Sequence, residues 1–263
     1  MNIETYYQRI GFVPNPGESP EEQLYRIHEC HSYTIPFEDL NPLCHVPVST
    51  NPEDVFRKVI LRRRGGYCFE LNMLFQELLK ELGYQTRAIF CRPYSAEGVK
   101  LALSHRFTIV TIGQQEYLAD VGLGGNGWVA PLRLEVGTEQ LVGTRVFKIT
   151  GPVDGEYTVN LKFGDTFAPV LDFTKKEAVP FDFEMSNYYT SSYARSPFVN
   201  RMMCVLPTRD GRYTIRDRSL TLEKGTVKEV IPLTPENIEK ILDDYFGICL
   251  TTAMLQQIKE YLS

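Results

Sequence analysis

The hydrophobic period of the sequence changes at Gly83, and this change limits the fold more than any other feature. Between Cys68 and Leu82, apolar side chains recur at three- and four-residue intervals from Leu71 onward, which is one face of an amphipathic helix. Gly83 is suited to end that helix in the left-handed conformation. Residues 85–173 instead form short β-branched runs separated by turn residues. The sequence therefore predicts an α+β protein with its helices and strands in separate parts of the chain.

The middle of the chain is expected to form an antiparallel barrel or sandwich. Its predicted strands are residues 86–92, 107–112, 117–121, 144–150 and 157–163. A loop-like stretch rich in Tyr and Ser follows at residues 186–196, before three strand-like segments at 200–207, 211–217 and 220–223. A helical region closes the chain, with Thr234 as its predicted N-cap and Pro235 as its first helical residue.

Length and composition restrict the class of protein. At 263 residues the chain exceeds the size at which one hydrophobic core readily grows, so we expect two or three packed units. Apolar residues make up 43% of the chain and charged residues 23%, which excludes a disordered or fibrous class. No secretory pattern opens the sequence, and no apolar run reaches the roughly 18 residues that a membrane-spanning helix needs. We therefore expect a cytoplasmic protein without a membrane partner.

The net charge of −5 argues against a nucleic-acid partner, because binding phosphates requires clustered Lys and Arg on a basic surface. The six cysteines are too sparse for a disulfide framework, and a reducing cytosol would keep them as thiols. His28 and His31 flank Cys30 on a predicted helix, but no third ligand stands at a convincing spacing. We expect no metal site.

Residues 64–72 (RGGYCFELN) form the most informative stretch for chemistry. Two glycines precede Cys68, which is predicted to lie in the first turn of the strongly amphipathic helix. Unpaired N–H groups and the helix dipole stabilise a thiolate at that position, which favours the reactive form of the side chain. The alternative is that Cys68 is a small buried apolar residue, as most cysteines are. The segment alone does not separate the two interpretations.

A nucleophilic cysteine also needs a base and a group that orients the base. His105 opens one predicted strand and Asp120 lies on the next, so a hairpin could bring them together. A turn centred on residues 112–113 would pair them directly. A loop at residues 113–116 would place Asp120 opposite Ile109, roughly 13 Å along the strand from His105. Both registers put the two side chains on the same face of the sheet.

Residues 122–127 (GLGGNG) formally match a dinucleotide-binding pattern, but no helix start follows them to hold a pyrophosphate. They also lack the Gly-Lys-Ser/Thr of a phosphate-binding P-loop. A glycine-rich turn beside Asp120 would instead let a thin ligand arm approach the backbone closely.

Motifs spread over nearly the whole chain resemble those of the arylamine N-acetyltransferases. They are residues 6–11 (YYQRIG), His31 with 35–40 (IPFEDL), 64–72 (RGGYCFELN), 120–125 (DVGLGG), 196–198 (SPF) and 246–248 (FGI). The segment around Cys68 is the most specific of them.

The resemblance implies an α+β fold with an N-terminal helical bundle, an antiparallel β-barrel, a C-terminal α/β lid and a papain-like catalytic core. We place the bundle with the nucleophile at residues 1–84, the barrel with the histidine and aspartate at 85–190, and the lid at 191–263. Cys68, His105 and Asp120 match the family's catalytic triad.

The resemblance also implies ligands. Acetyl-coenzyme A is the implied donor, and arylamines, hydrazines or N-hydroxyarylamines are the implied acceptors. Gly124 and Gly125 match the turn along which the family passes the pantetheine arm of coenzyme A. Phe37 and Phe198 match positions that line the acceptor pocket.

Two departures from the family pattern lie near that pocket: Leu123 replaces a Phe, and residues 91–93 (CRP) replace a more common Ala-Arg-Val. They bear on the acceptor range rather than on the chemistry. Two other functions fit the same scaffold: a papain- or transglutaminase-like hydrolase using the same triad, and a binding module without turnover. The local signature of a papain-type cysteine is absent, and the complete triad argues against a silent module.

Overall fold

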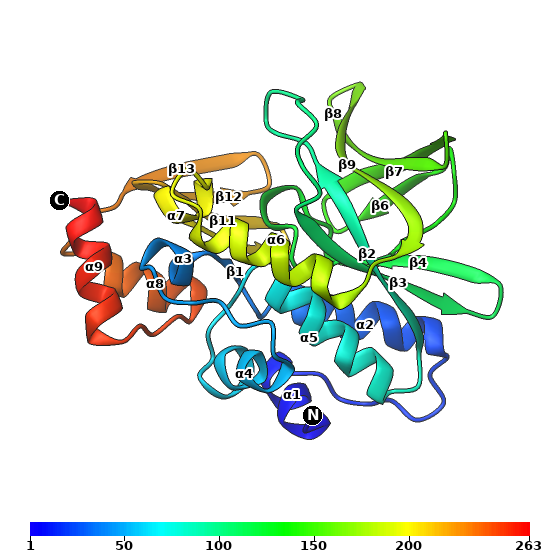
Figure 1. The fold of residues 1–263 in the computed structure, drawn as a ribbon, viewed down its shortest axis with the longest axis horizontal. Helices are drawn as coiled ribbons and strands as arrows, with labels where there is room; N and C mark the ends of the chain where they lie inside the picture. Colours follow the sequence, from blue (N-terminus) through cyan, green and yellow to red (C-terminus); the bar gives the residue numbers. More distant parts are fainter.

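Helices make up most of the first 81 residues and form one end of the molecule (Figure 1). The structure is a computed structural model that describes all 263 residues. The N-terminal helices are α1 (Ile3–Ile10), α2 (Pro20–Ser32), α3 (Leu40–Leu43), α4 (Pro52–Phe56), the π-helical turn η1 (Arg57–Leu61) and α5 (Cys68–Glu81). Side-chain caps fix several of their starts. Ser19, for example, accepts from the N–H of Glu22 while the Glu22 carboxylate accepts from Ser19, which begins α2.

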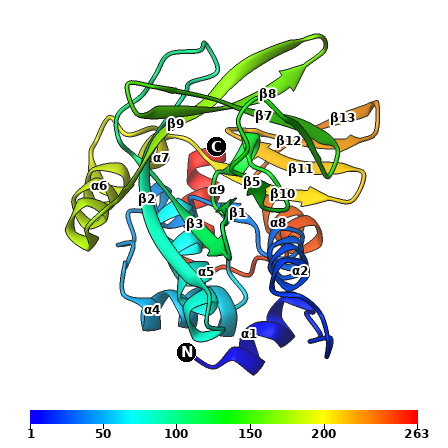
Figure 2. The ribbon, with the colours of Figure 1, turned by 90° about the vertical axis from the view of Figure 1, so that its right-hand side faces the viewer.

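Eight antiparallel strands follow and curl into a nearly closed barrel (Figure 2). They are β2 (Gln85–Pro93), β3 (His105–Ile112), β4 (Gln115–Ala119), β5 (Leu132–Arg133), β6 (Glu139–Val142), β7 (Arg145–Val153), β8 (Glu156–Phe163) and β9 (Thr166–Glu177). Their order in the sheet is β5-β4-β3-β2-β9-β8-β7-β6. Phe107, Phe147 and Phe173 fill the interior with aliphatic neighbours. The predicted antiparallel barrel is confirmed.

Helix α5 joins the helical end to the barrel. It begins at Cys68 and ends before Leu82, and Gly83 follows in the left-handed conformation at φ +86°. Its apolar face packs in the core of the N-terminal helices, and its other side lies against β2 and β3, so nearly all of the helix is buried. The predicted helix and its glycine end are both confirmed.

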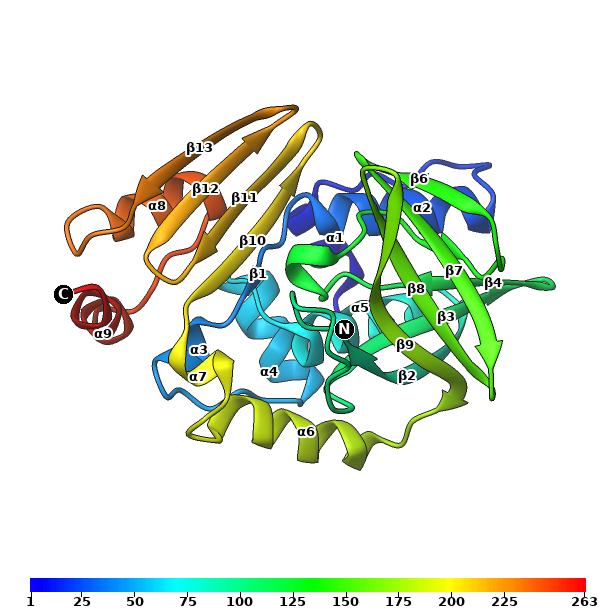
Figure 3. The same ribbon diagram turned by 90° about the horizontal axis from the view of Figure 1, so that it is seen from above.

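A second, five-stranded sheet lies beside the barrel (Figure 3). Its order is β1 (Phe37–Glu38), β10 (Met203–Thr208), β11 (Gly211–Arg216), β12 (Ser219–Lys224) and β13 (Val227–Pro232). The helices α8 (Ile238–Phe246) and α9 (Thr252–Leu262) pack against it through a shared apolar core. Because Phe37 pairs with Val205, the N-terminal segment is part of the C-terminal sheet. The strand segments predicted after residue 200 are found with small shifts of their ends.

The predicted loop at residues 186–196 is wrong. The structure has helix α6 (Pro180–Ser192) there, followed by a short helix α7 (Pro197–Asn200). The buried seam of α6 consists of Phe183, Asn187 and Thr190, which are spaced as on one helix face. Only one of the three is apolar, so the seam leaves no hydrophobic period in the sequence.

The predicted start of the last helical region is also wrong. Helix α8 begins at Ile238 with Asn237 as its N-cap, and Thr234 opens a preceding turn in which its N–H donates to the Asn237 side chain. The strands β1, β5, β6, β9 and β13 were not predicted. β9 contains Pro169 and ends in a charged Lys-Lys-Glu run, both of which hide its alternation of apolar and polar residues.

The division of the chain into three units at residues 84 and 190 stays a prediction. None of the helices combines the length and the apolar character that a membrane-spanning segment requires.

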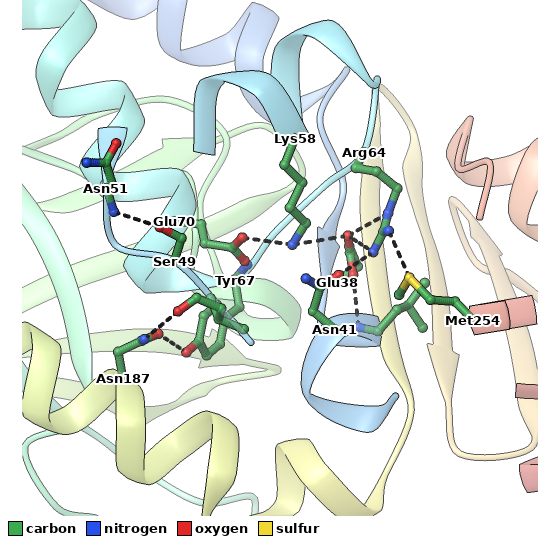
Figure 4. A network of polar contacts seen from close by, with 12 residues as sticks. Glu38, Asn41, Ser49, Asn51, Lys58, Arg64, Tyr67, Glu70, Asn187 and Met254 are labelled. Atoms are coloured by element: carbon green, nitrogen blue, oxygen red, sulfur yellow. Dashed lines mark hydrogen bonds and ion pairs between the residues drawn. The ribbon is translucent and has the colours of Figure 1, made fainter. Parts of the chain in front are cut away.

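A buried ionic network ties the loop before Cys68 to its surroundings (Figure 4). The Glu38 carboxylate accepts from Arg64 at 2.7 Å and from the backbone N–H of Leu40 at 2.9 Å, and Lys58 lies 3.6 Å away. Lys58 also bridges to Glu70 at 2.8 Å. Burial alone would raise the pKa of Glu38, but the two cations overcome it and hold the pKa below its usual value.

The network leaves room for no side chain at Gly65. A Cβ there would stand 2.1 Å from the Pro36 carbonyl oxygen and 2.8 Å from the Glu38 side chain. The glycine before the nucleophile therefore lets the loop pack directly onto β1.

Glu38→Gln should destabilise the protein by about 3–5 kcal/mol, because it leaves Arg64 buried without its counter-charge, whereas Lys58 keeps Glu70. Urea denaturation followed by circular dichroism measures this loss. Asp244→Asn makes the same chemical change in the exposed Lys240–Asp244 pair and should alter stability by less than about 1 kcal/mol. Equal effects of the two substitutions would show that the buried network does not stabilise the fold.

Candidate active site

Cys68 is held at the first turn of α5 by the loop that precedes it. The Gly66 carbonyl accepts from the N–H of Glu38 at 2.8 Å, and the N–H of Gly66 points to the Pro36 carbonyl, so the loop continues the edge of β1. Tyr67 is the extended N-cap residue of α5. The Cys68 thiol is 4% exposed, with the Ser104 carbonyl 3.9 Å from its sulfur.

His105 and Asp120 meet across the β3–β4 hairpin. The Nε2 atom of His105 lies 2.6 Å from Oδ2 of Asp120, and both side chains are buried. Both predicted registers are wrong: Ile112 pairs with Gln115 across a two-residue turn, which makes Asp120 a diagonal neighbour of His105. The prediction that the two side chains share a face holds, because the observed register lies two residues from each proposed one.

Asp120 lies just beyond the end of β4, where three further contacts fix it. Its Oδ1 accepts from Asn72 Nδ2 at 2.8 Å and from the N–H of Gly122 at 2.9 Å. Its own N–H donates to Nε2 of His28 at 3.1 Å. Asn72 also accepts from the N–H of Val121, so it holds both the carboxylate and the chain beside it.

Asn72 and His28 were missed as site residues in the sequence. Asn72 stands one helical turn after Cys68, and this spacing on a buried face is the signal that could have found it. His28 gave no such signal, because Asp120 and Val129 lie 92 and 101 residues away along the chain. Burial lowers the pKa of His28 to about 4, so its ring is neutral, donates from Nδ1 to the Val129 carbonyl at 3.0 Å and accepts at Nε2.

The charge of His105 is set by opposing effects. Burial alone would lower its pKa, but the Asp120 carboxylate and the hydrogen bonds to Asp120 and Cys68 raise the pKa to about 10. At neutral pH the ring is therefore an imidazolium between a carboxylate and a thiol. Since Nε2 faces Asp120, Nδ1 is the nitrogen that faces Cys68.

An apolar groove of about 620 Å³ is lined by Ser104, whose carbonyl lies 3.9 Å from the Cys68 sulfur, although Cys68 is not part of its lining. The loop between β2 and β3, which includes Ser104, forms one wall, and α6 with Phe198 forms the other. Phe198 packs 6.5 Å from Phe37 and 5.6 Å from Tyr67 between ring centroids, in the same apolar cluster as Cys68. The structure thus brings Phe37 and Phe198 together next to the thiol.

The glycine turn lies on the other side of Asp120. A Cβ on Gly122 would stand 2.8 Å from the Cα of Cys68, and one on Gly124 would stand 3.3 Å from the Phe37 ring. At Gly125 a Cβ would meet nothing within 4 Å, so the backbone faces open space. Leu123 packs against the barrel core.

A thiol at a helix start, facing a histidine that a buried carboxylate orients, is the arrangement of enzymes that form acyl-cysteine intermediates. The sequence profile described as N-acetyltransferase matches residues 22–255. The arylamine N-acetyltransferase of Mycobacterium tuberculosis strain H37Rv is 32% identical over 257 residues, which cover 94% of this chain and 89% of that protein. The chain belongs to the arylamine N-acetyltransferase family.

Solved structures agree with this assignment. The Mycobacterium smegmatis arylamine N-acetyltransferase superposes with a TM-score of 0.92 at 29% identity, covering 100% of this chain and 99% of that one. The Mycobacterium marinum enzyme in complex with CoA superposes with a TM-score of 0.91 at 27% identity, covering both chains fully. The α+β fold of the family, with its barrel and C-terminal sheet and helices, is therefore confirmed over the whole chain.

Asp120→Asn should slow the alkylation of Cys68 by iodoacetamide at pH 7 by about tenfold or more, because an uncharged His105 would no longer stabilise the thiolate form of the side chain. The carboxylate raises the pKa of His105 to about 10, so the parent protein keeps an imidazolium up to that pH.

Cys249 is the internal control, because it is exposed and should react at the same rate in both proteins. Peptide mass spectrometry separates the two thiols, and circular dichroism checks the fold. If Cys68 reacts equally fast with and without the carboxylate, Asp120 does not set the charge of His105.

Proposed function

We propose that this protein transfers the acetyl group of acetyl-coenzyme A to the nitrogen of arylamines, hydrazines or N-hydroxyarylamines, through a thioester on Cys68. The observation that carries the proposal is the 2.6 Å contact of His105 with Asp120 beside the thiol at the start of α5. Membership of the family supports the same donor and acceptors.

In the first half-reaction the Cys68 thiolate attacks the acetyl carbonyl. The thioester bond to coenzyme A breaks, and the His105 imidazolium gives its proton to the departing thiolate. One thioester replaces another of similar energy, so this step has little thermodynamic cost. Asp120 stabilises the imidazolium and holds the ring in its orientation.

In the second half-reaction the amine nitrogen attacks the acetyl group on Cys68. The neutral His105 takes the proton that the nitrogen loses, and Cys68 leaves as a thiolate. The enzyme thus returns to the thiolate–imidazolium pair with which it began. Ping-pong kinetics follow from the two separate steps.

The surroundings of the thiol suit the two substrates from different sides. The apolar groove offers the ring of Phe198, which packs against Phe37, to an arylamine, and Leu101 and Leu103 extend that surface outward. The open backbone at Gly125 gives space for the thin pantetheine arm. The Mycobacterium marinum relative that was solved with CoA supports coenzyme A as the donor.

The two departures from the family pattern differ in what they touch. Leu123 contacts the barrel core and lines the small cavity beside Phe37, so it affects the space near the thiol. Cys91 is fully buried, and its sulfur lies 3.4 Å from the carbonyl of His105, so it supports the backbone of that residue. We propose that Leu123 is the residue that alters the acceptor range.

Acetyl-coenzyme A without any amine should add one acetyl group to the protein, on Cys68. Because Cys68 is buried, its surroundings exclude water and protect the thioester until an amine arrives. Peptide mass spectrometry locates the added mass, and adding an arylamine should discharge it with formation of the acetylated amine.

Cys68→Ala should remove both the label and the turnover, whereas Cys249→Ala should change neither. A peptidase-like enzyme would take no acetyl group from this donor, and a binding module would form no bond. Acetyl transfer at the parent rate by Cys68→Ala would refute the proposal.

A further inference from the structure

The connection between β2 and β3, residues 94–104, forms one wall of the apolar groove. Its residues 101–104 line the groove, and the Ser104 carbonyl lies 3.9 Å from the Cys68 sulfur. Leu101 and Leu103 are 43% and 41% exposed, so the protein itself leaves much of their apolar surface uncovered. That surface is available to a ligand in the groove.

This connection is a small hairpin of its own. Tyr94 and Lys100 form a bridge across it, and the N–H of Ser95 donates to the Val99 carbonyl at 2.9 Å. An isolated two-stranded hairpin is only marginally stable in water. The position of its leucines therefore depends on the contacts that hold the hairpin to the barrel.

Asp172 on β9 lies under the hairpin, on the outer face of the barrel. In the register of the sheet it stands directly opposite Arg92 on β2 and Thr158 on β8. The residues before and after it belong to the barrel core, so its own side chain points outward. It is nevertheless only 3% exposed, because Tyr94 and Lys100 of the hairpin cover it.

Lys100 supplies the counter-charge of this carboxylate. Its Nζ lies 2.5 Å from Oδ2 of Asp172 and 2.6 Å from Oε2 of Glu156. The Tyr94 hydroxyl donates to the same Oδ2 at 2.7 Å, and the Thr158 hydroxyl donates to Oδ1 at 2.6 Å. Tyr94 and Lys100 thus fasten both sides of the hairpin to the barrel, and removing the cation would leave a buried carboxylate unpaired.

Arg92 does not take over this role. Its guanidinium donates from Nη1 to the Leu101 carbonyl at 3.3 Å and forms no ion pair. Asp172 therefore has Lys100 as its only cation. The charge balance between the hairpin and the barrel depends on this one lysine.

We propose that Lys100 is a positioning residue for the acceptor: by holding the hairpin against the barrel, it keeps Leu101 and Leu103 in place to contact the distal part of a large arylamine. The inference rests on the proposed function and assigns a residue that determines which arylamines are used. A groove of about 620 Å³ is larger than a single aromatic ring needs, so its outer wall matters for acceptors with a second ring. Small acceptors would react at the thiol without reaching the two leucines.

The test compares two acceptors, aniline and 4-aminobiphenyl, which carry the same reacting amine but differ by one ring. The parent protein should use 4-aminobiphenyl with the lower KM. Lys100→Gln should lower kcat/KM for 4-aminobiphenyl about tenfold more than kcat/KM for aniline, because apolar contact with the second ring is lost. The difference should come from KM for the amine. The rate at which acetyl-coenzyme A acetylates Cys68 without any amine should stay unchanged.

Asp172→Asn removes the opposite charge of the same pair and should cause the same selective loss. Lys100→Arg keeps the positive charge and should recover most of the activity with 4-aminobiphenyl. Lys162→Gln is the matched control, because it removes a barrel lysine of similar exposure, whose partner Glu139 lies 2.9 Å away. It should leave the ratio of the two amines unchanged, and circular dichroism checks the fold of each variant.

Equal losses with the two amines, or an equal loss in the acetylation of Cys68, would show a general structural role for Lys100 and overturn the inference. An unchanged ratio of the two amines in Lys100→Gln would overturn it as well. Both results leave acetyl transfer by the parent protein intact. A parent protein that acetylates no arylamine or hydrazine would instead refute the proposed function, and this inference with it.

Discussion

The Asp120 carboxylate is buried at the point where the helical end of the molecule meets the barrel. A charge in that position must be surrounded by hydrogen-bond donors, because leaving it unpaired would cost several kcal/mol. Its donors come from three directions: His105 on β3, Asn72 on α5 and the backbone of the glycine turn. Satisfying one carboxylate therefore fixes the hairpin, the nucleophile helix and the turn relative to one another.

A second buried carboxylate does the same for the other side of the thiol. Glu38 on β1 binds Arg64 in the loop before the nucleophile, and β1 is itself an edge strand of the C-terminal sheet. Tyr67 extends this support to α6, because its hydroxyl donates to the Asn187 side chain (Figure 4). The position of Cys68 thus depends on contacts with every major part of the chain, which explains why the motifs of the family are spread over its whole length.

The sequence predicted those parts of the fold that depend on local patterns. Helix α5 was predicted to its ends because its apolar spacing and Gly83 act within a few residues. The barrel was predicted because β-branched alternation is also local. Helix α6 was missed because its buried seam holds Asn187 and Thr190, whose burial depends on partners elsewhere in the chain.

The candidate active site shows the same contrast between local patterns and contacts with distant parts of the chain. Cys68 was recognisable from its own segment, whereas the pairing of His105 with Asp120 depended on a turn that the sequence could not place. Contacts such as those of His28 with Val129 and Asp120 join residues from separate elements, so no spacing in the sequence reveals them. The residues alone offered Cys68, His105 and Asp120 as candidates, and the resemblance to a family identified them as a triad because the members of the family share a fold.

The central claim is that the acetyl group rests on the protein between the two substrates. Exchange of isotopically labelled coenzyme A into acetyl-coenzyme A, measured with no amine present, tests it most directly. The account predicts exchange at a rate no slower than overall turnover, because the first half-reaction is complete and reversible by itself. Turnover with an amine but no exchange without one would show that the acetyl group passes directly between bound substrates, and would contradict the account.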